Sequence, residues 1–288
     1  MKDVIRKKAK LYWPLIKSLQ TGLLLVTGIA GFVSARCPVI SWQILTGLTG
    51  SLFLAISGST VLNMVYDRDI DAKMPRTAHR PIVTGAVTKN EALILGIILS
   101  CVGVVWAMVL SLQFGIVVLM GLFLDAVVYT IWLKRRTPWS IVWGGISGGM
   151  PILAGRVLGT GHIDMIGILF AFAILLWIPT HILTFSIRYK EDYISAGIPT
   201  FPSWYGVDKT RIIIALASIG AAIAIAVGIF SLGLSLGYLR MLLLLSFGLI
   251  ILAVTSVYNP SDKTNFLLFK YASVYMLSAM LIISIGSF

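Results

Sequence analysis

Asn63-Met-Val-Tyr-Asp67-Arg-Asp69-Ile-Asp71 is the most informative stretch of the chain, because it places three carboxylates and one amide between two long apolar segments. On a helix, Asn63, Asp67 and Asp71 are spaced i, i+4 and i+8 and share one face, whereas Asp69 points the other way. Carboxylates stacked on one face repel each other unless a cation lies between them. Mg²⁺ suits such a face, since it takes one or two carboxylates and completes its octahedron with water and phosphate oxygens.

The same polar stretch carries four cationic side chains, Arg68, Lys73, Arg76 and Arg80. Guanidinium and ammonium groups beside a metal-bound phosphate neutralise the same oxygens. A solvated, charged loop is the simpler interpretation of an arbitrary acidic stretch. Here the shared helical face at the end of an apolar segment favours a cation and phosphate site.

The composition places this site in a membrane protein. The chain has 288 residues, of which 58% are hydrophobic and only 12% are charged, and its mean hydropathy is +0.95. These values exclude a soluble domain and predict a single polytopic membrane domain over 1–288. The net charge of +12 lies mostly on the connections between spans, so we expect no nucleic-acid partner.

Nine apolar runs are long enough to cross a bilayer as helices, since the hydrocarbon core is about 30 Å thick. We predict spans near residues 14–35, 42–62, 91–111, 114–133, 140–158, 164–187, 210–232, 237–257 and 266–286. The first run is too long for a signal-peptide core and is expected to be retained, with Lys17 near its inner end reaching toward the membrane surface.

The distribution of Lys and Arg sets the orientation. Only Arg36, Arg156 and Arg240 fall on connections at the outer side, whereas the basic N-terminal residues 2–10 and the other basic connections fall at the inner side. We therefore expect a cytoplasmic N-terminus, with both polar stretches, 63–90 and 188–209, in the cytoplasm. His162 and Asp164 are expected to be solvated at the outer surface.

The second polar stretch continues a row of polar side chains. His181, Arg188 and Asp192 are spaced i, i+7 and i+11 and lie near one face of a helix. This row is expected to face the first acidic row across a cavity. His181 follows Trp177-Ile-Pro179-Thr180 inside an apolar run, so it is either satisfied by a neighbouring side chain or binds a ligand.

Two further features of the spans have two interpretations each. Asp125 is the only carboxylate well inside an apolar run, where a charge is costly; it lines the site with Tyr129 or makes a structural hydrogen bond to another helix. The glycine-rich run 144–155 either allows close helix packing or leaves room for a large flat ligand.

At this point the chain resembles the UbiA superfamily of intramembrane prenyltransferases, and within it the protoheme IX farnesyltransferase (heme O synthase) branch. The resemblance covers residues 20–205 and rests on several motifs in order: Asn63-x-x-x-Asp67-x-x-x-Asp71, Arg76-Thr-x-His79-Arg80-Pro81, Tyr129-Thr-x-Trp-Leu-Lys134-Arg135-Arg136, Gly144-Gly145 with Met150-Pro151, and Trp177-x-Pro179-x-His181 leading to Asp192-Tyr193. Many members carry a second complete Asp-x-x-x-Asp, whereas here Ala196 stands four residues after Asp192, as in the heme branch.

The resemblance implies an all-α bundle of nine helices around a central cavity. It implies transfer of a farnesyl group from farnesyl diphosphate to a vinyl group of heme b, which is substrate rather than cofactor, through an allylic carbocation. It also implies roles for the residues of the two polar stretches. Mg²⁺ would be held by Asn63, Asp67, Asp71 and Asp192, with Lys134 also catalytic, and substrate would meet Arg76, Arg80, Asp125, Tyr129, His181 and Arg188.

Two alternatives stay open. A prenyltransferase of the same fold would act on a quinone precursor or a lipid, and an ion-coupled transporter would use Asp125 and the acidic row. The transporter predicts polar residues near the midplane of broken helices, whereas the acids here gather at span ends. The expected location is the plasma membrane of a prokaryote, with product handed to a heme A synthase or a terminal oxidase.

Overall fold

The computed structural model describes residues 11–36 and 41–287, and within these ranges the chain is helical with no strand. The basic residues 2–10, on which part of the predicted orientation rests, lie outside the described ranges. The elements, in order, are η1 (Trp13–Ile16), α2 (Ser18–Ser34), α3 (Trp42–Tyr66), α4 (Arg68–Asp71), α5 (Lys89–Leu110), α6 (Leu112–Leu122), η2 (Phe123–Leu133), α7 (Ser140–Thr160), α8 (Met165–Arg188), α9 (Lys190–Ser195), α10 (Phe201–Trp204), α11 (Val207–Ser231), α12 (Leu236–Tyr258) and α13 (Asp262–Gly286).

The prediction of an all-α, multi-pass membrane protein is confirmed. Eight stretches among the described residues are long and apolar enough to cross a membrane, with α6 and η2 forming one of them. The predicted spans 42–62 to 266–286 match them within a few residues. The remaining span is represented by α2, an apolar helix of 17 residues and about 25 Å, so nine crossings and the side of the N-terminus stay predictions.

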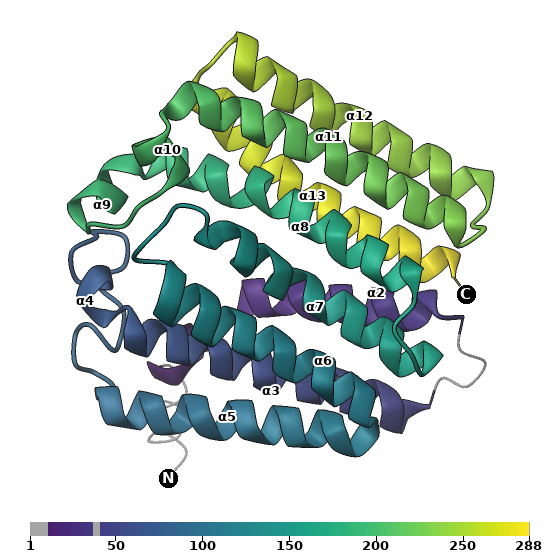
Figure 1. Cartoon of the computed structure of the whole chain (residues 1–288), viewed down its shortest axis with the longest axis horizontal. Coiled ribbons are helices and arrows are strands. Elements are labelled where there is room, and N and C mark those ends of the chain that lie inside the picture. The colour runs from purple at the N-terminus through teal and green to yellow at the C-terminus, as the bar shows by residue number, and fades with distance from the viewer. Residues whose placement is uncertain (1–10, 37–40, 288) are drawn as a thin grey trace.

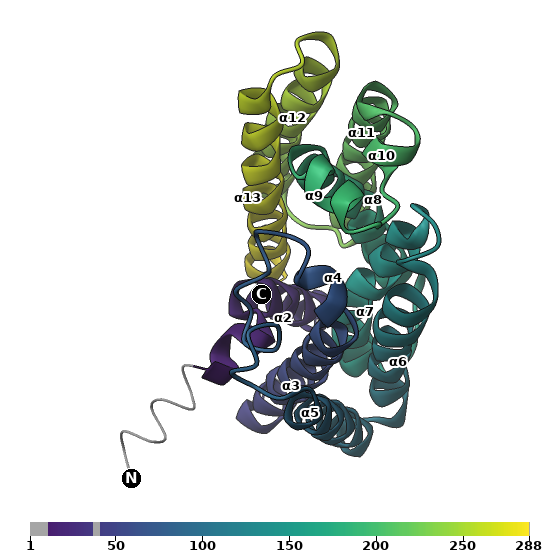
Figure 2. The same ribbon diagram turned by 90° about the vertical axis from the view of Figure 1, so that its left-hand side faces the viewer.

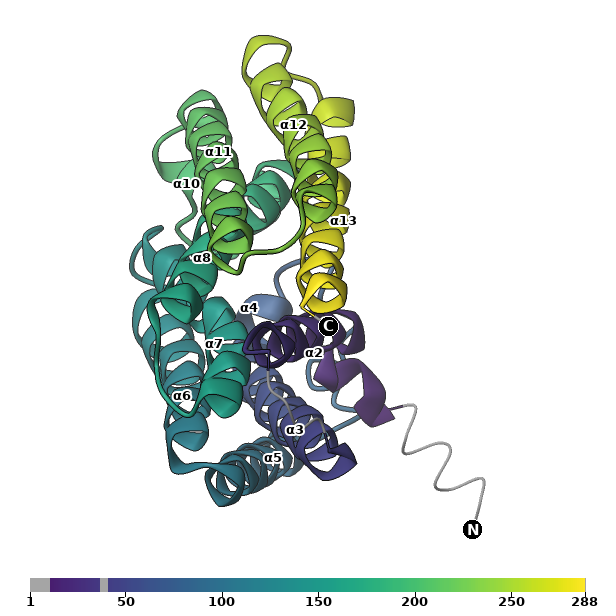
Figure 3. The ribbon, with the colours of Figure 1, turned by 90° about the vertical axis from the view of Figure 1, so that its right-hand side faces the viewer.

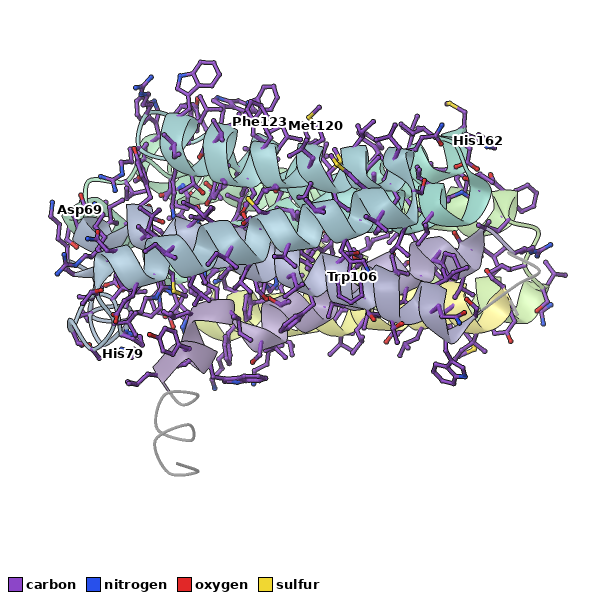
Figure 4. All side chains as sticks on the ribbon, turned by 90° about the horizontal axis from the view of Figure 1, so that it is seen from below. Asp69, His79, Trp106, Met120, Phe123 and His162 are labelled. Carbon is purple, nitrogen blue, oxygen red and sulfur yellow. The ribbon has the colours of Figure 1, made fainter. Side chains whose placement is uncertain are left out.

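The long helices lie side by side and run between two ends of the molecule (Figure 1). The short helices α4, α9 and α10 gather at one end, called here the polar end. Figure 4 shows Asp69 and His79 at the polar end and His162 at the opposite end. Both polar stretches therefore lie at the same end of the bundle, as the alternation of spans predicts.

The helices pack as a closed ring. Each helix contacts the next in the order α2, α3, α5, α6, α7, α8, α11, α12, α13, and α13 contacts α2. Contacts of α2 with α7 and of α8 with α13 cross the ring and divide it into two groups, α2 to α7 and α8 to α13. The end-on views show both groups (Figures 2 and 3). Each group has its own buried apolar core.

The glycines of α7 settle one of the open interpretations in favour of close packing. A Cβ on Gly155 would lie 1.9 Å from the carbonyl oxygen of Gly28, and a Cβ on Gly149 would lie 2.7 Å from that of Ala171. A Cβ on Gly144 would lie 3.2 Å from the ring of Tyr129. The glycines therefore let α2, α8 and η2 approach α7.

An ion pair between Arg156 and Asp164, which was not predicted from the sequence, joins helices at the end opposite the polar end. Asp164 was expected to be solvated, but it caps α8 through Gly167 and accepts hydrogen bonds of 2.6–2.9 Å from Arg156. The guanidinium of Arg156 also donates to the carbonyl and hydroxyl of Ser34. Arg156 thus ties α2, α7 and the start of α8 together, because its five donors reach three elements at once.

Replacing Asp164 with Asn should lower the free energy of unfolding in detergent at pH 7 by roughly 1.5–3 kcal/mol, because charge-assisted hydrogen bonds of a buried guanidinium are lost. The hydrogen bonds from Arg156 hold the pKa of the Asp164 carboxyl below its ordinary value of 3.8, against the opposing effect of burial. This stabilisation is present above the unfolded-state pKa and is lost as the pH falls through the lower folded-state value.

Thermal unfolding of both proteins at pH 7, 5 and 3 tests this prediction. The Tm difference between wild type and Asp164→Asn should be largest at pH 7 and should shrink at pH 3. Asp262→Asn, which removes an exposed acid from the first turn of α13, is the matched control and should change the Tm little. Equal Tm values for wild type and Asp164→Asn at pH 7 would show that the ion pair is dispensable.

Candidate active site

The predicted acidic row is present at the polar end. Helix α3 ends at Tyr66, and Asp67 joins it to the short helix α4. The i to i−4 hydrogen bonds nevertheless continue, from Asp67 N to Asn63 O at 2.9 Å and from Asp71 N to Asp67 O at 2.8 Å. Asn63, Asp67 and Asp71 therefore stay in helical register and all three are buried.

Asp69 points away from the row, as predicted. Its side chain is 61% exposed and forms a bidentate pair with Arg135 at 2.7 and 2.8 Å. Arg135 also donates to the carbonyl of Tyr66 at 2.7 Å and stacks on the Tyr66 ring. This pair joins the end of α3 to the turn after η2, so its role is to hold the site together.

Each buried carboxylate of the row has a cation from another segment. Asp67 accepts a hydrogen bond from Lys134, which follows η2. Asp71 accepts one of 2.5 Å from Arg80, in the polar loop after α4. Two buried negative charges one helical turn apart are thus compensated by two cations.

The row still offers free oxygens. The Oδ1 of Asp67 is buried, accepts no hydrogen bond from any described residue, and lies 4.0 Å from Arg135. The Asn63 amide donates from Nδ2 to Thr130 Oγ1 at 2.9 Å, which leaves its Oδ1 as an acceptor. No three His, Cys, Asp or Glu side chains in the described ranges are close enough to hold an ion alone. This donor set fits Mg²⁺, which takes few protein oxygens and completes its shell with water and phosphate.

A π-helix presents the opposite wall of this site. In η2 the backbone bonds run from i to i−5, as from Lys134 N to Tyr129 O, and this wider helix was not expected from the sequence. π-helical segments occur often at functional sites. Here the segment brings Thr130 to Asn63, and Lys134 to Asp67 with its ammonium 5.6 Å from the Tyr129 ring.

Asp125, also in η2, makes an inter-helix hydrogen bond. Its Oδ2 accepts from Ser59 of α3 at 2.5 Å, and its backbone carbonyl accepts from Thr130 at 2.7 Å. The side chain is half-buried rather than fully enclosed. The structural interpretation of Asp125 is therefore confirmed, because its side chain links η2 to α3. Its role in lining the site with Tyr129 stays a prediction.

Lys17, which was expected to reach toward the membrane surface, is half-buried. It stands in the turn between η1 and α2 with φ 43° and ψ 59°, a left-handed backbone that is rare for lysine. Burial, together with the charges of Arg80 and Lys134, lowers the pKa of Lys17 to about 8, and the opposing charges of Asp125 and Asp71 offset only part of this effect.

Lys134 is fully charged in this setting. Burial by itself lowers the pKa of Lys134, but the nearby Tyr129, Asp67 and Tyr193 outweigh it and raise the pKa above the ordinary value. Tyr193, from α9, thereby places a phenol close to the cluster. The sequence named Tyr193 only as part of a motif, and its contribution depends on how α9 packs.

The second polar stretch covers the first, but it does not bring Asp192 into the acidic row. Ile70 and Met74 pack with Ala196 and Ile198 in a small apolar cluster that joins the two stretches. Asp192 is half-buried, and no hydrogen bond or ion pair of its side chain joins it to another described residue. The role of Asp192 as a metal ligand stays a prediction.

Three predicted substrate contacts lie on a different wall, formed by α8 and α13. Arg76 and Arg188 stack on aromatic rings of these helices, and His181 lies between the rings of Trp177 and Phe269 at 5.1 and 4.6 Å. The Nδ1 of His181 lies 3.3 Å from Ser273 Oγ. His181 thus has a neighbouring partner and keeps Nε2 for another one.

A pocket of about 300 Å³ also opens at the polar end, between the turn after η2 and the segment from α9 to α10. Arg135, Ile194, Pro199 and Trp204 are among its lining residues. It does not include the acidic row. The central cavity expected from the resemblance therefore stays a prediction.

Comparisons with known proteins show the family of this chain. The UbiA prenyltransferase family matches residues 24–276. A protein named protoheme IX farnesyltransferase from Archaeoglobus fulgidus is 42% identical over 212 residues, 74% of each chain. One of the same name from Pyrobaculum neutrophilum is 36% identical over 263 residues, 91% of this chain and 94% of the relative.

Solved structures share the fold at lower identity. A structure described under digeranylgeranylglyceryl phosphate synthase has a TM-score of 0.80 at 20% identity and covers 98% of this chain and 99% of its own. A UbiA homolog from Archaeoglobus fulgidus bound to GPP and Mg²⁺ has a TM-score of 0.70 at 17% identity, with 95% and 99% coverage. The family match covers residues 24–276, and the two curated relatives are 36–42% identical to this chain. The chain therefore belongs to the UbiA prenyltransferase family and is a prenyltransferase.

Proposed function

We propose that the chain transfers a farnesyl group from farnesyl diphosphate to a vinyl group of heme b and so produces heme o. The observation that carries the prenyl-transfer step is the buried row of Asn63, Asp67 and Asp71, with an unpartnered Asp67 oxygen and two cations already in place. A distant homolog of the same fold is bound to GPP and Mg²⁺, which supports a prenyl diphosphate and a divalent cation as ligands.

In this proposal Asn63, Asp67 and Asp71 hold Mg²⁺, with Asp192 as a further candidate ligand. The metal ion supplies Lewis-acid stabilisation of the leaving diphosphate. Lys134 and Arg80, with Lys17 as a further candidate, neutralise diphosphate oxygens as negative charge develops on them. The side chains do this without moving far, because Lys134 and Arg80 already contact the row.

The proposed reaction has three steps. The allylic C–O bond breaks and the diphosphate leaves with the electron pair. The vinyl group of heme attacks the allylic cation with its terminal carbon and forms the new C–C bond. Water adds to the adjacent carbon and loses a proton, which gives the hydroxyethylfarnesyl group. The protein positions the two lipophilic substrates and shields the cation from bulk water.

The choice of heme b as acceptor rests on the relatives. Proteins named protoheme IX farnesyltransferase are 36–42% identical to this chain over most of its length. The aromatic surroundings of His181 suit a large flat acceptor. We further propose a cytoplasmic active site in a prokaryotic plasma membrane, entry of both substrates from the lipid, and delivery of the product to a heme A synthase or a terminal oxidase.

Replacing Asp67 with Ala should lower the rate of prenyl transfer about 100-fold or more, because the transition state loses a metal ligand. The assay combines membranes or nanodiscs with heme b, farnesyl diphosphate and Mg²⁺, and separates the hemes by reverse-phase chromatography. Wild type should form a later-eluting heme, and EDTA should abolish it.

Asp69→Ala is the matched control, since Asp69 carries the same charge two residues away but faces out of the row. It should keep activity within a few-fold of wild type. Diphosphate release in the presence of 4-hydroxybenzoate or a lipid alcohol, with no new heme, would reassign the acceptor. Transfer that persists in Asp67→Ala and in EDTA would overturn the metal site.

Replacing Lys17 with Met should weaken farnesyl diphosphate binding about tenfold at pH 7, the effect of about 1.4 kcal/mol. Because the pKa of Lys17 is lowered to about 8, its ammonium is charged at pH 7 and loses its proton as the pH rises through 8. Wild-type affinity should therefore fall between pH 7 and 9 more steeply than that of Lys17→Met.

Titration of wild type and Lys17→Met with a non-hydrolysable farnesyl diphosphate analogue at pH 7, 8 and 9 measures this difference. The ionisation of the ligand affects both proteins equally and therefore cancels in the comparison. Lys73→Met, which removes an exposed charge from the loop after α4, is the control and should follow the wild-type pH curve. Parallel curves for wild type and Lys17→Met would remove Lys17 from the site.

A further inference from the structure

A column of aromatic rings lines the contact between α8 and α13. Trp177, His181, Phe185 and Tyr189 follow one another at i+4 spacing, so they form a stripe along one face of α8 that ends at the polar end. We call these four rings, with Phe266 and Phe269 of α13, the aromatic column. In the end-on view of Figure 2, α8 and α13 lie above α2 and α3.

The rings of the column contact one another in sequence. The centroids of Trp177 and His181 are 5.1 Å apart, those of His181 and Phe269 are 4.6 Å apart, and both pairs are stacked. Phe269 continues to Phe185 at 5.9 Å, and Phe185 to Tyr189 at 4.6 Å. Most of these rings are only partly buried, so the column keeps accessible aromatic surface.

Three cations stand at the polar end of the column. The Arg76 guanidinium lies 4.8 Å from the Phe185 ring, the Arg188 guanidinium 4.4 Å from the Phe266 ring, and the Lys270 ammonium 4.5 Å from the same Phe266 ring. None of the three forms an ion pair with a carboxylate in the described ranges. The Nε of Arg76 is buried and has no hydrogen-bond partner there.

This cation group differs from the group around the acidic row. There, Lys134 and Arg80 are paired with Asp67 and Asp71, next to oxygens that suit a metal ion. The cations of the aromatic column are not paired with acids in this way among the described residues. Such a group binds an anion without a bridging metal ion. A guanidinium group can bind a carboxylate through two parallel hydrogen bonds. The two groups therefore suit two different anions.

We propose that the aromatic column and its three cations form the acceptor subsite, in which rings hold a planar macrocycle and Arg76, Arg188 and Lys270 bind its two carboxylates. A flat apolar ring with two propionate groups at one edge, as in heme b, matches this order of aromatic surface followed by positive charge. Arg76, which the sequence analysis grouped with phosphate contacts, and Arg188, which it listed as a substrate contact, then select the acceptor. This inference rests on the proposed function, since it assigns the residues that recognise the heme.

The test compares heme b with its dimethyl ester, which has the same ring but no carboxylates. Binding to wild type and to the double variant Arg188→Gln/Lys270→Gln is measured in nanodiscs by quenching of tryptophan fluorescence, with empty nanodiscs subtracted. The double variant should bind heme b about tenfold more weakly or worse. It should bind the dimethyl ester as wild type does, and the KM for farnesyl diphosphate should stay unchanged.

Lys209→Gln/Lys263→Gln is the matched control, because it also removes two positive charges from exposed positions, in the first turns of α11 and α13. It should bind heme b like wild type. Equal losses for heme b and its ester would show a purely structural role and overturn the inference, and a raised KM for farnesyl diphosphate would return Arg188 to the diphosphate site. Wild type that binds neither ligand would overturn the proposed acceptor, and with it the inference.

Discussion

The repulsion between two buried carboxylates, Asp67 and Asp71, is the constraint on which the polar end depends. They lie one helical turn apart, and a buried charge without a counterion costs several kcal/mol. Lys134 and Arg80 supply the counterions from two other segments. The turn after η2 is therefore fixed to the end of α3, and the loop after α4 is fixed to α4. The site is assembled by charge compensation as much as by apolar packing.

The packed ring of apolar helices holds the buried carboxylates and their counterions in fixed positions. Glycines at the contacts of α2 and α7 bring the backbones together, and Arg156 with Asp164 closes the far end. With both ends fixed, the polar end has little freedom to relieve its charges by moving apart. The site thus combines a rigid scaffold with electrostatic groups held in place before substrate arrives, which is what electrostatic catalysis requires.

The spans and the acidic row could be predicted because they depend on local patterns. Apolar runs give helix positions within a few residues, and the i, i+4, i+8 spacing gives a shared face whatever the neighbours are. The left-handed backbone of Lys17 before α2 could not be predicted, because lysine rarely adopts it. The π-helix in η2 and the position of Arg188 on the Phe266 ring likewise depend on packing between elements distant in sequence.

The unpartnered Oδ1 of Asp67 has a thermodynamic consequence. A cation that takes this oxygen weakens the hold of Asp67 on Lys134, and Lys134 is then available to a phosphate oxygen. A diphosphate that engages Lys134 in turn exposes more of Asp67 to the cation. By linkage each ligand must raise the affinity for the other by the same factor. In the proposed function, the row would therefore bind the metal–diphosphate complex more tightly than either component alone.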